Sequence, residues 1–260
     1  MGKRVRDPVS SEQTSALSTR ISAPMALMRH LEARLRQGEH LTLFGPRGSG
    51  KSTLLRALEL RLSRAGVPCA YSPSTDHLDD ITRALEQAYP AVATATISRR
   101  AARARLWQAA DASPGVLLLD AFANVSNAMV TLLRRLHGGV AGVLVAVDVD
   151  SERERRRLRA WRYGSMRVCM PRTPARNLRR LLQGRCQELS LPLPDKVTER
   201  MLLRAARGRP GWILECTALE REARYWRDSR LLVNVLCTDT EATVRLCARP
   251  WADRTPSSRH

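Results

Sequence analysis

The sequence predicts an α/β protein: a parallel β-sheet flanked by helices, followed by a small C-terminal helical lid. Between residues 40 and 170, short apolar runs alternate with amphipathic stretches, which is typical of a parallel sheet covered on both faces. A glycine-rich turn at residues 45–52 joins the first apolar run to the helix that follows it. After Pro171 only helical patterns occur.

The core is assigned to residues 23–170, after a polar, serine-containing arm at residues 1–22. Helices are expected where apolar residues recur every three or four positions, and strands where short apolar runs lie between turn residues. The run at 116–119 is wholly apolar, which indicates a strand buried on both faces. In chain order, the expected elements are helix 23–37, strand 41–44, helix 51–65, strand 69–71, helix 78–89, a helical region 91–113, strand 116–119, helix 128–137, strand 140–147 and strand 166–170.

The lid is assigned to residues 171–226, with helices expected at about 174–189, 195–206 and 211–226. Residues 227–260 form a C-terminal extension, with an apolar run at 231–237 and a helix-like stretch to Cys247, and are read as an extra strand or an interaction tail. Core packing or lid anchoring is favoured over base stacking for Trp161, Trp212, Trp226 and Trp251.

Composition excludes several classes of protein. The chain has 260 residues, 43% of them hydrophobic and 27% charged, which suits a globular protein and excludes wholesale disorder or a disulfide-stapled miniprotein. It has no apolar run of about 18 residues and no apolar stretch near its start, so we expect a cytoplasmic protein with no membrane segment. The six cysteines show no C-x-x-C spacing and are expected to be buried free thiols in a reducing compartment.

The charge balance indicates a polyanionic partner. Lys and Arg total 44 against 25 Asp and Glu, which gives a formal net charge of +19. A surface of this charge attracts nucleic acid and releases its counterions on binding. Acidic membrane or protein surfaces, and a basic surface without function, are the alternatives. The arginine-rich stretches at 99–105 and 153–162 are the candidate phosphate contacts.

Residues 45–52 read Gly-Pro-Arg-Gly-Ser-Gly-Lys-Ser and match the phosphate-binding pattern G-x-x-x-x-G-K-[S/T]. The glycines allow backbone N–H groups to surround a phosphate, and the following helix points its positive dipole end at the same group. Lys51 is expected to reach the β- and γ-phosphates of ATP, and Ser52 to bind Mg²⁺. The expected core is therefore a P-loop NTPase. The residues expected to contact the nucleotide here are Gly45, Pro46, Arg47, Gly48, Ser49, Gly50, Lys51, Ser52 and Thr53.

Acidic residues stand at the ends of two predicted strands. Asp120 follows strand 116–119 and is expected to be the carboxylate ligand of Mg²⁺, with Ser52 as the second protein ligand. Asp148 directly follows the fourth predicted strand, where a polar side chain would face the γ-phosphate; loop solvation is the alternative. Lys51, Asp120 and Asp148 are the candidate catalytic residues.

The residue after the predicted metal ligand is Ala121. Many ATPases of this layout carry Glu there to polarise the attacking water, so we expect weak or regulated hydrolysis. Asn124 is a candidate for orienting water, with a capping or turn role as its alternative. An arginine within 153–159 is a candidate for acting on a neighbouring subunit's site, and a solvated mixed-charge helix is the alternative.

With these parts in this order, roughly residues 23–222 resemble the AAA+ ATPases. The loop, the two aspartates and the helical region after Pro171 carry the resemblance. The segment 207–213 is similar to the turn that opens the last lid helix of that family. Within the class, the sequence is most similar to small bacterial transposition-regulator, helicase-loader and ExeA-type ATPases. The family's lid arginine aligns with Gly211, so the resemblance leaves Arg207 or Arg209 to contact the nucleotide.

The resemblance and the charge together predict an ATP-binding protein that assembles on duplex DNA as a homo-oligomeric ring or filament. Its expected role is to recruit or regulate a transposase, recombinase or helicase. A STAND-type signalling switch without DNA binding is the alternative, although this chain lacks the large sensor repeats of such switches. A small-molecule kinase is a third reading, and it would need an acceptor pocket.

Overall fold

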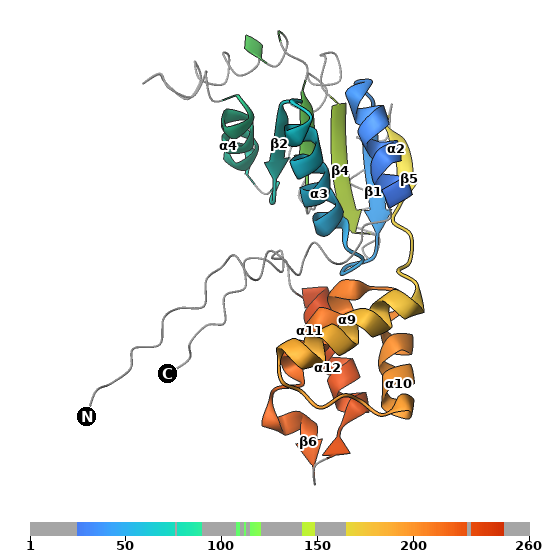
Figure 1. Ribbon diagram of the computed structural model, residues 1–260. Coiled ribbons are helices and arrows are strands. Elements are labelled where there is room, and N and C mark those ends of the chain that lie inside the picture. Colours follow the sequence, from blue (N-terminus) through green and yellow to red (C-terminus); the bar gives the residue numbers. More distant parts are fainter. Residues whose placement is uncertain are drawn as a thin grey trace, which may run out of the picture.

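The structure is a computed structural model, and it describes residues 25–75, 77–89, 108–109, 112, 115–120, 142–148, 165–227 and 230–246. Within these residues, a parallel sheet with flanking helices lies next to a separate group of helices (Figure 1). The arm at 1–22, the helix expected at 128–137 and the arginine-rich stretches at 99–105 and 153–162 lie outside the described residues.

The sheet confirms the predicted α/β class. Its five strands have the order β2-β3-β4-β1-β5, and every neighbouring pair is parallel. Because parallel neighbours need crossover connections, helices are expected on both faces of such a sheet. The strands are β1 (His40–Gly45), β2 (Cys69–Ser72), β3 (Val116–Leu119), β4 (Gly142–Asp148) and β5 (Met166–Cys169).

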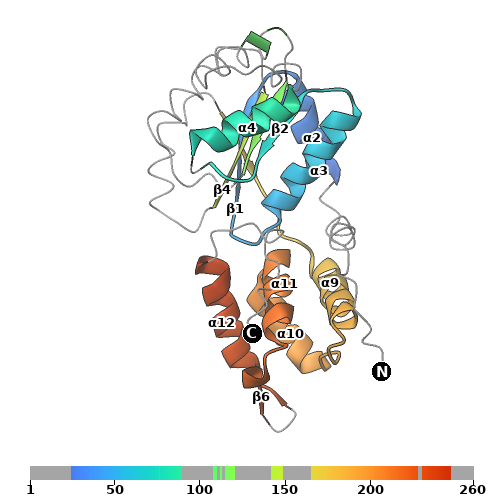
Figure 2. The ribbon, with the colours of Figure 1, turned by 90° about the vertical axis from the view of Figure 1, so that its left-hand side faces the viewer.

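Helices cover the two faces of the sheet with separate apolar clusters. α2 (Met25–Arg36) and α3 (Lys51–Arg64) place leucines such as Leu31 and Leu58 on one face. α4 (Leu78–Ala88) places Ile81 and Leu85 on the other (Figure 2). Full burial of one such side chain stabilises the fold by roughly 1.5–3 kcal/mol. These two clusters hold the strand ends in place.

The lid has a core of its own. α9 (Ala175–Glu188), α10 (Lys196–Ala206), α11 (Pro210–Leu219) and α12 (Val233–Leu246) share one apolar cluster. Trp212 is buried in that cluster, which confirms core packing for this tryptophan. α12 lies within the segment expected to be a C-terminal extension, and its Leu236 is fully buried in the cluster. The structure therefore adds a fourth helix to the three predicted for the lid.

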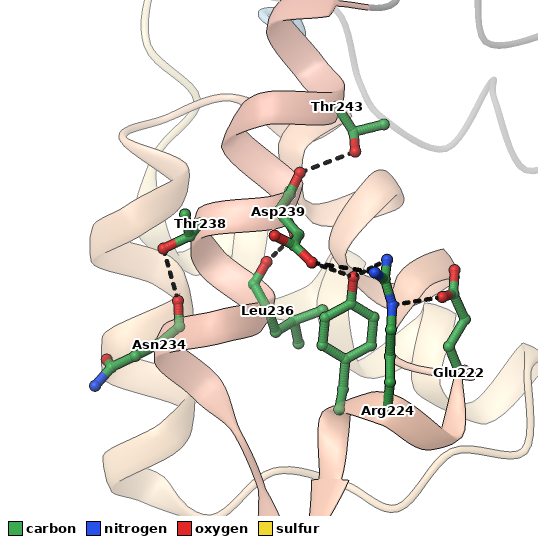
Figure 3. A network of polar contacts seen from close by, with 9 residues as sticks. Glu222, Arg224, Asn234, Leu236, Thr238, Asp239 and Thr243 are labelled. Carbon is green, nitrogen blue, oxygen red and sulfur yellow. Dashed lines mark hydrogen bonds and ion pairs between the residues drawn. The ribbon is translucent and has the colours of Figure 1, made fainter.

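The helix predicted at 211–226 is too long, because α11 ends at Leu219. A short 3-10 helix, η2 (Ala223–Tyr225), and a hairpin of β6 (Trp226–Arg227) and β7 (Arg230–Leu231) follow it. The Trp226 indole N–H donates to the Glu220 carbonyl at 2.8 Å. The hydroxyl of buried Tyr225 donates to Asp239 on α12 at 2.9 Å. These two bonds hold the chain in a turn, although helical spacing alone predicts that the helix continues. Figure 3 shows the polar contacts around Asp239.

The cysteines were expected to be buried free thiols, and the structure shows that they differ in burial. Cys186 and Cys216 are buried free thiols, as expected, and burial raises the pKa of Cys186 to about 11. Cys169 is exposed on the edge strand β5, so the expectation of burial is wrong for this residue. Within the described ranges, no helix has the length and apolar character needed to cross a membrane.

Candidate nucleotide-binding site

The glycine-rich loop lies where β1 ends and α3 begins. β1 ends at Gly45 and α3 starts at Lys51, with Gly50 as its N-cap residue. Gly48 and Gly50 have φ angles of 74° and 95°, in the left-handed region that favours glycine. The loop therefore has the strand–turn–helix context that a phosphate-binding loop requires.

Lys51 is a buried cation at the point where the loop enters α3. Its side chain is 8% exposed, and its Nζ donates to the carbonyl oxygens of Gly45 and Pro46 at 2.8 and 3.0 Å. The same Nζ lies 2.6 Å from Oδ1 of Asp148, and the Nε of Arg47 lies 3.2 Å from Oδ2 of that carboxylate. A buried ammonium group needs anionic or carbonyl partners, and phosphate oxygens would serve in the same way.

Strand register explains why Asp148 meets the loop. Asp148 is the last residue of β4 and lies opposite Gly45 on β1. The strand predicted at 140–147 placed this carboxylate just beyond the strand end, whereas the structure places it within the strand. Since parallel strands end at one edge of the sheet, the end of β4 delivers an acidic group directly beside Lys51.

Asp120 lies at the same edge, one strand further away. It follows Leu119, which lies opposite Val145 on β4, and its backbone N–H donates to the Ser72 carbonyl at 2.9 Å. Asp120 is only 3% exposed, and the hydroxyl of Tyr71 donates to its Oδ2 at 3.0 Å. Burial, and then the charge of Asp120, raise the pKa of the Tyr71 hydroxyl, which therefore stays a donor at neutral pH.

Tyr71 is the contact that sequence reasoning missed. It lies on β2, opposite Leu118 of β3, so the pairing of two strands brings it beside Asp120. Nothing in the local pattern around residue 71 signals this contact, because it depends on strand order.

Three hydroxyl-bearing residues of the loop and of the first turn of α3 differ in burial. Ser52 and Thr53 are half-buried in the first turn of α3. Ser49 is 4% exposed, and its Oγ has no hydrogen-bond partner among the described residues. A buried hydroxyl of this kind is expected to find a partner, which a bound phosphate chain would provide.

Arg209, the lid arginine expected to contact the nucleotide, has its partners within the lid. Its guanidinium forms an ion pair with Glu241 of α12 at 2.5 Å and also donates to the carbonyls of Ala205 and Ala206. To contact a nucleotide, this side chain would have to leave Glu241. Ala121 and Asn124, the other residues considered for hydrolysis, lie outside the described part of the chain.

The lid reaches the loop through the start of α11. The carboxyl ends of the strands face the lid in both views (Figures 1 and 2). The Gly211 N–H donates to the Gly48 carbonyl oxygen at 2.8 Å. Gly211 is the position where the resemblance aligns the family's lid arginine, and here it is in main-chain contact with the loop.

A family model described as an AAA domain matches residues 33–155 of the chain. The match includes the loop, Asp120 and Asp148. Together with the parallel sheet and its P-loop, the match shows that residues 33–155 are similar to an AAA domain. No curated protein sequence matches the chain.

Solved structures with a similar fold share little sequence with this chain. Cdc6p from Pyrobaculum aerophilum has a TM-score of 0.50 and 14% identity, and the match covers 77% of this chain and 61% of that one. The ORC2 protein of Aeropyrum pernix, solved in ADPNP-ADP complexes, has a TM-score of 0.48 and 20% identity, with 84% and 66% covered. The chain thus spans about two thirds or less of the length of these proteins, and its likeness to Cdc6p concerns the fold alone.

Proposed function

We propose that this chain binds ATP with Mg²⁺ at the loop of residues 45–52. The observation that carries the proposal is the convergence of Lys51, Asp148 and the loop at one edge of the sheet. Backbone N–H groups of the loop and Lys51 would hold the phosphates, and Ser52 and Asp120 would hold Mg²⁺. The metal, when bound, neutralises phosphate charge.

The oxygen atoms of Ser52 and Asp120 suit a Mg²⁺ ion that is bound together with ATP. A hydroxyl and one carboxylate are the protein ligands that Mg²⁺ uses when phosphate oxygens and water complete its coordination. The described residues contain no group of three or more His, Cys, Asp or Glu suited to holding a metal by itself. A site built for a metal–nucleotide complex is therefore favoured over a free-standing metal site.

ATP acts here as an assembly switch with slow turnover. Ala121 replaces the carboxylate that would polarise the attacking water. Arg209 is held by Glu241, so its expected contact with the nucleotide requires a rearrangement of the lid. Both features favour a long-lived ATP-bound state rather than rapid hydrolysis.

The assembly partner is duplex DNA. The formal charge of +19 supports a phosphate-backbone contact without sequence preference. The chain would form a homo-oligomeric ring or filament on DNA and recruit or regulate a transposase, recombinase or helicase, in line with the small bacterial AAA+ ATPases that its sequence resembles.

Nucleotide binding is tested by calorimetry with a non-hydrolysable ATP analogue and Mg²⁺. Lys51→Ala removes a charge-assisted contact and is expected to weaken binding roughly tenfold to a hundredfold. Lys196→Ala is the matched control, because Lys196 is exposed on α10 in the lid. Equal affinity of the wild type and Lys51→Ala would show that the loop does not bind the nucleotide.

Assembly on DNA is tested by electron microscopy and sedimentation of the full chain with duplex DNA. Rings or filaments are expected with the ATP analogue and not with ADP. Particles that form equally without a nucleotide, or no DNA binding at low salt, contradict the assembly role.

A further inference from the structure

α10 carries apolar side chains on the side of the helix that faces away from the lid core. Its inner side is buried, with Leu202 and Ala206 in the apolar cluster of the lid. On the outer side, Val197 is 65% exposed and Met201 is 40% exposed, and Leu193, just before the helix, is 59% exposed. A surface helix needs one apolar face to pack on its own core. The packing of the lid therefore does not explain the outer apolar row.

Exposed apolar side chains are concentrated at this place. The described residues expose seven large apolar side chains, and three of them lie between residues 193 and 201. The other four lie one each on α2, α3, β5 and α12. Single exposed apolar side chains are common on protein surfaces, whereas neighbouring ones mark interaction sites. Val197 and Met201 are neighbours, because residues four positions apart share one face of a helix.

A row of basic side chains runs beside the apolar row. Lys196, Arg200 and Arg204 follow one another at intervals of four and are all exposed. Arg200 comes three positions after Val197, and Arg204 three positions after Met201. Residues three apart are also neighbours on a helix, so each arginine lies next to an apolar side chain. None of the three basic side chains forms an ion pair with a described residue.

The carboxylates at this helix are engaged elsewhere. Asp195 caps α10 and accepts from the backbone N–H groups of Val197 and Thr198 at 2.7 and 3.0 Å. Glu199 forms an ion pair with Arg179 of α9 at 2.6 Å. These contacts leave the charge of the basic row uncompensated. The outer face of α10 therefore combines apolar and cationic groups.

The charge of this face decides what can cover it. A second copy that used the same face would bring two basic rows together, and like charges repel. The longer segments outside the described residues each have a positive formal net charge; they are 1–24, 90–107, 121–141, 149–164 and 247–260. Nucleic acid would pair with the basic row and leave the apolar row in water. The face is thus best matched by a protein segment with acidic and apolar groups.

We propose that the outer face of α10 docks an acidic amphipathic helix of a partner protein. The partner's apolar row packs on Val197 and Met201, and its Asp or Glu side chains pair with Arg200 and Arg204. Apolar seams flanked by charges select partners in this way between paired helices. α10 has only 11 residues, so the interface is small and the complex is transient. The surface lies in the lid (Figure 1), and the inference does not rest on ATP binding.

The probe is a synthetic, fluorescently labelled helical peptide with one row of Leu flanked by Glu. Two control peptides differ from it in one feature each: Lys in place of Glu, or Ala in place of Leu. Fluorescence anisotropy measures binding of each peptide to the full chain without a nucleotide, at a salt concentration of about 0.15 M to screen long-range attraction. The Glu–Leu peptide is expected to bind at least about tenfold more tightly than either control. Equal affinity for all three peptides overturns the proposal.

The apolar row is tested with Met201→Gln, which is expected to weaken binding of the Glu–Leu peptide by about tenfold. Met25→Gln is the matched control, because Met25 is exposed to a similar extent, 46%, but lies on α2. Both positions are on the surface, so both variants should unfold at the wild-type temperature in circular dichroism. Wild-type affinity for the peptide in Met201→Gln contradicts docking on this face.

The basic row is tested by charge reversal in the double variant Arg200→Glu/Arg204→Glu. It is expected to lose affinity for the Glu–Leu peptide and to gain affinity for the Lys-containing peptide. Arg176→Glu/Arg180→Glu on α9 is the matched control, because these arginines are exposed in the lid but have no large exposed apolar side chain on their helix. Equal losses in the two double variants would assign the binding to overall charge and overturn the proposal.

Duplex DNA and vesicles of phosphatidylserine and phosphatidylcholine are the other candidate occupants. Met201→Gln is expected to bind both as the wild type does. A loss of affinity for DNA or vesicles as large as the loss for the peptide would make this face a nucleic-acid or lipid contact instead. Because every measurement is made without a nucleotide, failure of ATP binding leaves this inference intact, and failure of peptide docking leaves the proposed nucleotide site intact.

Discussion

Tyr71 illustrates how a single side chain outside the loop shapes the proposed Mg²⁺ site. Its hydroxyl donates to Oδ2 of Asp120 and so holds one oxygen of the carboxylate that is proposed to bind Mg²⁺. Hydrogen bonds of this kind orient metal ligands, and their removal typically costs roughly tenfold to a hundredfold in metal affinity. Tyr71 is thus a positioning residue for Asp120.

Tyr71→Phe is expected to raise the Mg²⁺ concentration needed for binding of the ATP analogue by about tenfold. The measurement is a Mg²⁺ titration at constant analogue concentration. Tyr225→Phe is a matched control, because the Tyr225 hydroxyl also donates to a carboxylate, Asp239, but within the lid. An unchanged Mg²⁺ requirement in Tyr71→Phe would remove the role assigned to this hydroxyl.

At the scale of elements, α12 is held in the lid by a partly buried ion pair as well as by apolar packing. The side chain of Arg209 is 8% exposed and that of Glu241 is 30% exposed. Loss of one partner from a buried pair leaves an uncompensated charge, which is costly. The pair therefore makes the position of α12 depend on the turn that precedes α11.

Glu241→Ala is expected to lower the free energy of unfolding by about 2 kcal/mol, less than for a fully buried pair because Glu241 is partly solvated. Urea denaturation of the full chain measures this change. Glu222→Ala, which breaks the exposed Arg224–Glu222 pair, is expected to cost about 0–1 kcal/mol. Equal effects of the two substitutions would contradict a special role for the pair on α12.

The end of α11 carries a buried carboxyl group that makes lid stability depend on pH. Burial raises the pKa of Glu220 to about 7, from an ordinary value near 4.5. The folded chain therefore keeps this proton at a pH where the unfolded chain has lost it. The stabilising contribution is complete below the ordinary pKa and is lost as pH rises through the folded value.

Glu220→Gln, which cannot ionise, is expected to flatten this dependence. The wild type should lose more thermal stability than the variant between about pH 5 and about pH 8. Thermal unfolding followed by circular dichroism measures the difference. Glu222→Gln, at an exposed position two residues further on, should retain the wild-type profile. Parallel profiles for wild type and Glu220→Gln would exclude Glu220 as the cause.

For the whole molecule, the net charge of +19 predicts how DNA affinity responds to salt. A protein that makes 6–10 phosphate contacts loses roughly 10³–10⁵ in affinity between about 50 and 200 mM salt. The affinities for two duplexes of unrelated sequence should decrease with salt concentration at the same slope, because backbone contacts carry no sequence information. Fluorescence anisotropy measures both slopes. A flat salt dependence would argue against backbone binding.

The amino-acid sequence by itself determined the parts that depend on local spacing. The loop at 45–52, the strand before Asp120 and the first two lid helices follow from residue patterns within a few positions of each other, and the structure has them within about one residue of expectation. The length of α11 and the packing of α12 were not predictable in this way, since Tyr225 and Leu236 are buried by residues from other helices.

Only the tertiary structure decided which groups meet. Asp148 reaches Lys51 because β4 pairs with β1, and Tyr71 reaches Asp120 because β2 pairs with β3. The contact of Gly211 with Gly48 joins residues 163 positions apart by sequence number. Such contacts are set by strand order, register and the docking of separate cores, and none of these leaves a signal in local spacing.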